Sequence, residues 1–120
     1  MATSDTLGTT VLQLRLQEER TCRDDMAAAQ HRLDEARRQI HDLQEQADAY
    51  YYAAIVSQAE GQTEAAATYR RRRQQYTVER RKRVAELAAA KVQFGQSRES
   101  LLAAMKRRSQ LSLDEARHAV

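Results

Sequence analysis

The chain has 120 residues, of which 31% are charged and 5% aromatic, so it is long enough for one domain but poor in side chains that build a globular core. It contains no proline and three glycines. Its single cysteine excludes an internal disulfide and a cysteine-based zinc cluster. Its formal net charge is +3. The dominance of Ala, Arg, Gln, Glu and Leu is typical of long helices and predicts an all-α fold.

The first ten residues, MATSDTLGTT, lack the basic flank and apolar stretch of a secretory signal. No window of about 18 apolar residues occurs anywhere, so no membrane insertion is expected. The single thiol, Cys22, gives no sign of an oxidising compartment. We therefore expect a cytoplasmic protein.

The first helix is expected over about residues 10–58, because Thr10 and Gln13 have the spacing of a capping box. Apolar residues then alternate in steps of four and three, as in a coiled-coil seam. The members of this series are Cys22, Met26, Ala29, Leu33, Ala36, Ile40, Leu43, Ala47, Tyr50 and Ala54. Three leucines upstream are interpreted as out of phase with the seam: Leu12, Leu14 and Leu16.

Three consecutive tyrosines, Tyr50, Tyr51 and Tyr52, stand late in this helix. Successive helical residues point about 100° apart, so the three rings cannot all face one partner. Tyr50 falls on the seam, and at least one of the others needs a different explanation.

A turn is expected at about residues 59–62, within SQAEGQTEAA. Gly61 suits a left-handed C-terminal cap, Thr63 suits a new N-cap, and Glu64 places a favourable charge in the next first turn. A second helix is therefore predicted over about residues 63–111.

The second helix repeats the spacing of four and three, although several members are basic. Its series is Tyr69, Arg73, Tyr76, Arg80, Arg83, Leu87, Ala90, Phe94, Ser97, Leu101, Ala104, Arg108 and Leu111. The repeat again predicts a coiled-coil seam.

Charge is distributed unevenly between the two halves. Residues 1–58 carry 6 Lys and Arg against 10 Asp and Glu, a net of −4, whereas residues 59–120 carry 14 against 7, a net of +7. Complementary arms of nearly equal length favour an antiparallel two-helix coiled-coil hairpin, a single elongated domain over residues 1–120. Asp42, Glu45 and Asp48 would then lie near Arg73 and Arg80. The competing architecture is one uninterrupted helix in a parallel dimer, because a single glycine costs a helix only about 1 kcal/mol.

The tracts YRRRRQQY and RRKR place eight Lys and Arg between Arg70 and Arg83, with Glu79 as the one opposing charge. Such a field attracts phosphate or an acidic protein surface. A solvated helix face, a protein partner and RNA or DNA all remain open as explanations, although stacking aromatics on a nucleic-acid-binding platform are not evident.

No catalytic constellation is apparent, so the chain is expected not to be an enzyme. The histidines His31, His41 and His118 stand apart from Cys22, and no glycine-rich phosphate loop or HExxH motif occurs. His31 and His41 are spaced poorly for shared metal ligation on one helix face. No catalytic residue, cofactor site or metal site is predicted.

Two segments and one spacing pattern resemble the FliJ/YscO family of flagellar and virulence type III secretion export proteins. The segments are VLQLRLQEER near the start and LLAAMKRRSQL near the end. The pattern is Gln-x3-Leu-x2-Tyr-x3-Tyr, matched by Gln39, Leu43 and Tyr50, with Gln46 in place of the first tyrosine. Members of this family are small, basic antiparallel helical hairpins.

The resemblance implies a central stalk without an active site, cytoplasmic and peripheral to the inner-membrane export apparatus. Its partners would be a hexameric export ATPase, a membrane export gate and export chaperones. Tyr51 and Tyr52 would face the gate, and the paired arms, roughly residues 10–30 and 95–115, would enter the ATPase pore. The expected partner-binding residues are Gln39, Leu43, Tyr50, Tyr51, Tyr52, Arg70, Arg71, Arg72, Arg73, Lys106, Arg107 and Arg108. The alternative is a basic coiled-coil scaffold that binds RNA or another acidic partner through Arg70–Arg83.

Overall fold

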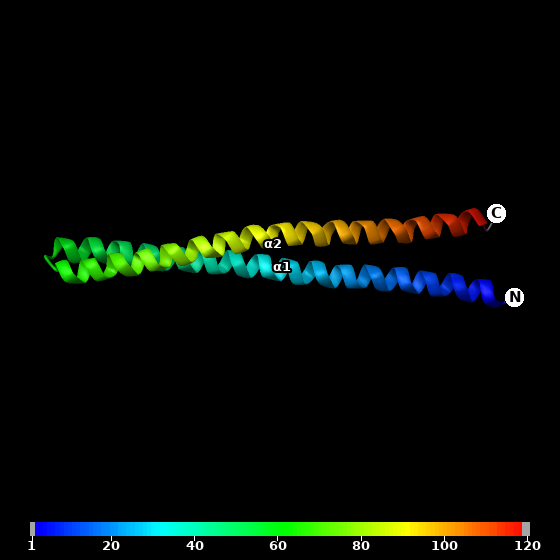
Figure 1. The fold of residues 1–120 in the computed structure, drawn as a ribbon, viewed down its shortest axis with the longest axis horizontal. Helices are drawn as coiled ribbons and strands as arrows, with labels where there is room; N and C mark the ends of the chain where they lie inside the picture. The colour runs from blue at the N-terminus through cyan, green and yellow to red at the C-terminus, as the bar shows by residue number, and fades with distance from the viewer. Residues whose placement is uncertain (1, 119–120) are drawn as a thin grey trace. The chain divides into compact units, whose positions relative to one another are not determined.

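Two long helices form the described part of the chain, residues 2–118, in a computed structural model; side chains are described for residues 10–118. Helix α1 spans Ala2–Ala59 and helix α2 spans Thr63–His118, with a short turn between them (Figure 1). The helices run antiparallel, and no strand occurs among the described residues. The fold class is therefore all-α, an antiparallel two-helix hairpin, as the sequence predicts.

The contacts divide the hairpin into two compact units. The terminal unit comprises Met1–His31 and Val92–Val120, and the turn unit comprises Arg32–Lys91. The sequence predicted a single domain and gave no sign of this division. Each unit contains one segment of α1 beside one segment of α2, so each has its own helix–helix interface.

The predicted seam of α1 is confirmed at all ten positions, each of which is buried or half-buried. On α2, twelve of the thirteen predicted positions are buried or half-buried, and the exception is the exposed Arg73. Alanine dominates the apolar residues with the least exposure, which are Ala29, Leu33, Ala36, Ala47, Ala54, Ala66 and Ala104. Because alanine buries little area, each of these contacts contributes little hydrophobic stabilisation, whereas the high helix propensity of alanine favours the two helices themselves.

The helix ends differ from the predicted boundaries, since α1 begins at Ala2 rather than near residue 10 and α2 ends at His118 rather than near residue 111. Thr10 therefore lies inside α1 and is not its N-cap. A capping sequence stabilises a helix end where one occurs, but it does not stop a helix whose preceding residues can continue it.

The α1 seam continues upstream of Cys22 in the same phase, through Glu19, Arg15 and Leu12, which are buried or half-buried. The prediction that Leu12 is out of phase was wrong, whereas Leu14 and Leu16 are exposed as expected. Two polar residues in the series, Glu19 and Arg15, hide its continuity from a search for apolar side chains.

The turn is a glycine-capped helix end, as predicted. Gly61 has φ 76°, in the left-handed region, and its N–H donates to the carbonyl oxygen of Gln58 at 3.2 Å. The N–H of Gln62 donates to the carbonyl oxygen of Ser57 at 2.8 Å, which completes a Schellman motif. The carbonyl of Gln62 accepts the first bond of α2, from Ala66 at 3.0 Å, so Gln62 rather than Thr63 occupies the N-cap position.

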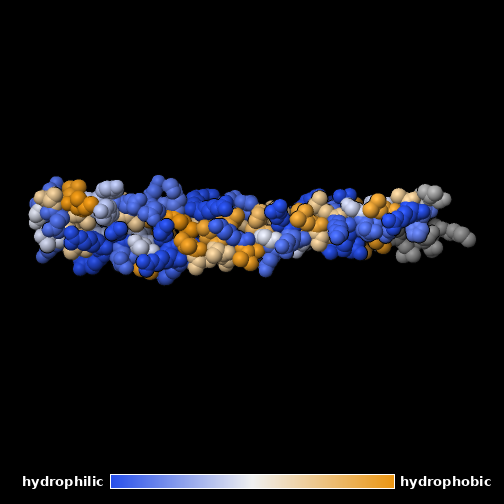
Figure 2. All heavy atoms as spheres, turned by 90° about the horizontal axis from the view of Figure 1, so that it is seen from above, coloured by the Kyte–Doolittle hydropathy of each residue, from blue (hydrophilic) through white to orange (hydrophobic). Residues whose placement is uncertain are grey.

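Hydrophilic side chains cover most of the face seen in Figure 2, and apolar patches interrupt them, one of them near the turn. Over the described residues, neither helix has a stretch long and apolar enough to cross a bilayer.

Candidate protein-binding surface

All five tyrosines of the chain lie in the turn unit, three on α1 and two on α2. Tyr50 is half-buried, and its ring stacks on that of Tyr76 with centroids 5.5 Å apart and an interplanar angle of 20°. The ring of Tyr69 lies tilted against Tyr50 at 6.0 Å. Tyr50 therefore joins the two helices, which confirms its predicted place in the seam.

Arg72 completes this interhelical contact from α2. Its Nη1 donates to the Tyr50 hydroxyl at 3.4 Å, and its guanidinium carbon lies 5.8 Å from the centre of the Tyr50 ring. The hydrogen bond that Arg72 donates to the Tyr50 hydroxyl raises the pKa of Arg72. Arg72 is consequently a permanent positive charge beside the stack.

Tyr51 and Tyr52 point away from the seam, and they are 43% and 65% exposed. Their rings meet edge to face with centroids 5.5 Å apart, and the guanidinium of Arg73 lies 4.6 Å from the centre of the Tyr51 ring. Ile55 and Val56, one turn further on, are 48% and 54% exposed. We call Tyr51, Tyr52, Ile55 and Val56 the aromatic patch.

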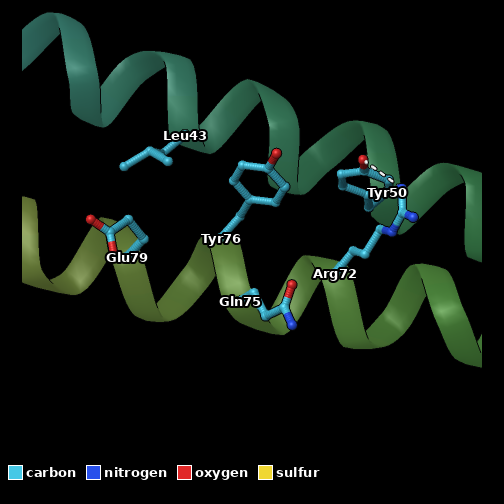
Figure 3. A pocket seen from close by; sticks show the side chains of 6 residues that line it. All are labelled: Leu43, Tyr50, Arg72, Gln75, Tyr76 and Glu79. Atoms are coloured by element: carbon cyan, nitrogen blue, oxygen red, sulfur yellow. Dashed lines mark hydrogen bonds between the residues drawn. The ribbon is translucent and has the colours of Figure 1, made fainter.

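Two grooves in the turn unit are lined in part by tyrosines. The first, of about 420 Å³, lies between the helices and is lined by Leu43, Tyr50, Arg72, Gln75, Tyr76 and Glu79 (Figure 3). The second, of about 200 Å³, is lined by Tyr51, Ala54, Ile55, Arg70 and Arg73, and we call it the side groove. The predicted site residues Leu43, Tyr50, Tyr51, Arg70, Arg72 and Arg73 thus line grooves in one unit, whereas Gln39 donates to Glu35 on its own helix at 3.4 Å.

The arginines at positions 70–73 are all exposed, and the contacts found for them are neutral. Arg70 donates to the Gln58 side-chain oxygen at 3.3 Å, and Arg71 donates to the Thr68 hydroxyl at 3.3 Å. The other two contact tyrosines, as described above. The four arginines therefore keep their positive charge available to a partner.

Two of the three carboxylates expected opposite these arginines, Glu45 and Asp48, are engaged along α1 instead. Glu45 lies 3.1 Å from His41, and Asp48 accepts from Gln44 at 2.8 Å. Further along α2, Glu79 and Glu86 pair with the basic residues of RRKR, Glu79 with Lys82 and Arg83 at 3.8 and 3.5 Å and Glu86 with Arg83 at 3.0 Å. Tyrosine–arginine contacts thus occupy the place where the sequence predicted ion pairs.

The predicted arm residues Lys106, Arg107 and Arg108 lie in the terminal unit, and Lys106 is exposed. Arg107 pairs with Glu18, and Arg108 Nε lies 2.7 Å from Glu19 Oε1. Glu19 is 2% exposed, and Arg108 occupies the α2 seam. Arg107 and Arg108 therefore join the two helices of this unit through ion pairs with α1.

Glu18 also accepts from Arg15 at 3.2 Å, so two cations flank its carboxylate. The hydrogen bond from Arg107 lowers the pKa of Glu18, and that from Arg15 acts in the same direction. The seam positions of Glu19 and Arg15 can be predicted by continuing the spacing of three and four upstream from Cys22. A search restricted to apolar side chains misses both residues.

The described residues contain no group of three or more His, Cys, Asp or Glu placed to hold a metal ion. His31 and His41 are exposed, and Cys22 is half-buried in the seam. The arrangement that does bring functional groups together, the aromatic patch with its arginines, offers contact area and positive charge. Comparison with models of known protein families, with curated proteins and with solved structures gave no match.

Proposed function

We propose that this chain is a coupling subunit of a type III secretion export apparatus, a stalk that links a hexameric export ATPase to a membrane export gate. Its sequence resembles the FliJ/YscO family in the segments quoted above, and its antiparallel hairpin agrees with that resemblance. The observation that carries the proposal is the division of the three consecutive tyrosines between seam and surface.

A role in the fold accounts for Tyr50 but not for its two neighbours. Tyr50 stacks between the helices, whereas Tyr51 and Tyr52 expose 43% and 65% of their surface next to exposed Ile55 and Val56. Tyrosine supplies rigid, amphipathic contact area and is enriched at binding hot spots. We therefore assign the aromatic patch to the gate.

The ATPase is assigned to the terminal unit, where charged residues cover both helix segments. A stalk of this kind contributes no reacting group, and it acts by stabilising some conformations of the ring over others, which is a coupling free energy between binding sites. Exposed Lys106 is the clearest candidate contact, since Arg107 and Arg108 already pair within the chain.

The proposal is tested by replacing both exposed tyrosines, Tyr51→Ala with Tyr52→Ala. We expect loss of binding to the gate protein in a pull-down at physiological salt, with stimulation of the export ATPase retained. Val78→Ala, an exposed apolar residue on α2 of the same unit, is the matched control and should change neither. Unchanged gate binding, or no interaction of the parent protein with an export ATPase, would reject the proposal.

Lys106→Glu provides the converse test in the terminal unit. We expect weaker ATPase stimulation with normal gate binding and an unchanged thermal melt, because Lys106 is exposed and lies off the seam. Reversal of Arg107 or Arg108 is unsuitable, since it would break an ion pair inside the hairpin.

The alternative, a scaffold that binds RNA through Arg70–Arg83, is favoured by the neutral partners of the first four arginines. It predicts tight binding to single-stranded RNA whose affinity falls steeply with salt, because each phosphate contact releases counterions. Such binding, together with no affinity for an export ATPase, would move the assignment to the scaffold.

A further inference from the structure

The side groove combines an apolar floor with two arginines at its edge. We propose that it binds an acidic protein segment that inserts one apolar side chain between Arg70 and Arg73. This inference rests on the proposed function, since it specifies the chemistry of the partner at the gate-facing surface.

The floor of the groove comes from Tyr51, Ala54 and Ile55, and its volume is about 200 Å³. Small-molecule sites usually measure about 300–1,000 Å³, so this groove is too small for a cofactor. A hollow of this size and lining suits a single leucine, isoleucine or phenylalanine, the type of anchor that fills pockets at protein interfaces.

The edge of the groove is positively charged, and the contacts of its two arginines are neutral. Arg70 donates to the Gln58 side-chain oxygen at 3.3 Å, and the guanidinium of Arg73 lies 4.6 Å from the centre of the Tyr51 ring. A guanidinium presents several N–H donors in a planar fork that matches a carboxylate. Because amide and ring contacts leave these charges unneutralised, the groove is complementary to Asp and Glu on either side of the anchor.

The aromatic patch extends the surface beside the groove. Tyr52, Ile55 and Val56 follow the spacing i, i+3, i+4 and lie on one face of α1, all of them exposed. Aliphatic side chains such as Ile55 and Val56 gain nothing from stacking on nucleic-acid bases, and a flat lipid surface would leave a hollow unfilled. An amphipathic protein segment covers both the groove and the patch.

The test uses a display library of random peptides, selected on the purified full chain. We expect the enriched peptides to combine one large apolar residue with flanking Asp or Glu. No enrichment, or enrichment of neutral or basic peptides, would overturn the inference.

The strongest peptide is then measured by fluorescence anisotropy. Arg70→Gln with Arg73→Gln, and the peptide's own Glu→Gln version, should each weaken binding about tenfold or more, because each removes charge-assisted hydrogen bonds. Arg81→Gln, an exposed arginine on the same helix outside the groove, is the control and should change affinity little. Equal binding by the double variant, with unchanged helicity by circular dichroism, would contradict the inference.

Two further probes separate partner classes and keep this inference distinct from the proposed function. Stronger binding of phosphatidylserine vesicles or of poly(U) RNA than of any selected peptide, lost in the same variant, would reassign the groove to lipid or RNA. Gate binding that survives Arg70→Gln with Arg73→Gln would leave the function standing and reject the acidic segment. Acidic peptide binding without any gate or ATPase interaction would support the acidic segment and reject the proposed function.

Discussion

Glu19 and Arg108 form the most buried ion pair described in the hairpin, with side chains 3% and 36% exposed and 2.7 Å between Nε and Oε1. Arg108→Met should leave the Glu19 carboxylate buried without its partner and lower the free energy of unfolding by about 1–3 kcal/mol. Replacing both residues by leucine should restore stability to the parent value or above, since apolar replacements of buried pairs are often neutral or stabilising. Urea denaturation followed by circular dichroism measures both. A double variant no more stable than Arg108→Met would contradict this view of the pair.

Glu18 makes the stability of the hairpin depend on pH. Its pKa is lowered from 4.5, mainly by the hydrogen bond from Arg107, so the folded state binds a proton less readily than the unfolded chain. The stabilisation is therefore present above pH 4.5 and is lost as the pH falls through the lowered folded value. Thermal melts should show Glu18→Gln less stable than the parent at neutral pH, with the difference disappearing in acid. A difference that persists or grows at low pH would contradict the ion pair.

Among individual residues, the sequence predicted the apolar seam positions well, but it missed the polar seam residues Glu19 and Arg15 of α1. The alternating spacing identifies Leu33 and Ala47 because burial of apolar side chains drives their placement. The same spacing admits Glu19 only because Arg108 lies opposite, and that is a property of the fold rather than of the local sequence. Likewise, nothing in the sequence indicates that Arg73 rests on Tyr51 rather than on a carboxylate.

Gly61 and Gly95 lie in different backbone settings, so we expect their replacement by alanine to change the free energy of unfolding in opposite directions. Gly95 lies within α2, and a Cβ added there would meet nothing within 4 Å. Gly95→Ala should therefore raise the free energy of unfolding by about 0.5–1 kcal/mol, through the higher helix propensity of alanine. Gly61 has equally open surroundings but φ +76°, so Gly61→Ala should destabilise by about 1 kcal/mol through backbone strain alone.

Thermal or urea unfolding of the two alanine variants decides this comparison, and Gly61→Asn is the control because asparagine tolerates the left-handed region better than alanine. Equal effects at the two positions would mean that the Schellman motif does not end α1 in solution.

The position of the turn could be predicted because its backbone conformation requires a glycine, Gly61. The outer helix ends could not, since no residue there forbids further helical turns.

For the molecule as a whole, the opposite charges of the two halves led to the correct antiparallel pairing. The contacts that realise it differ between the units: ion pairs join the helices in the terminal unit, and stacked tyrosines with Arg72 join them in the turn unit. Net charge indicates that the two arms attract each other but not which atoms meet. The exposure of Tyr51 and Tyr52 was predictable from helical spacing, whereas the groove lined by Arg70 and Arg73 was not.

The central claim is that one chain folds back on itself and thereby presents the aromatic patch. Spin labels at Asp42 and Arg81, both exposed and both in the turn unit, test it by pulsed electron resonance in a Cys22→Ser background. The hairpin predicts a distance of about 20–30 Å, two helix diameters plus the label arms, unchanged on dilution with unlabelled protein. An uninterrupted helix would separate the two sites by about 58 Å at 1.5 Å per residue. That longer distance, or a short distance that disappears on dilution, would contradict the hairpin.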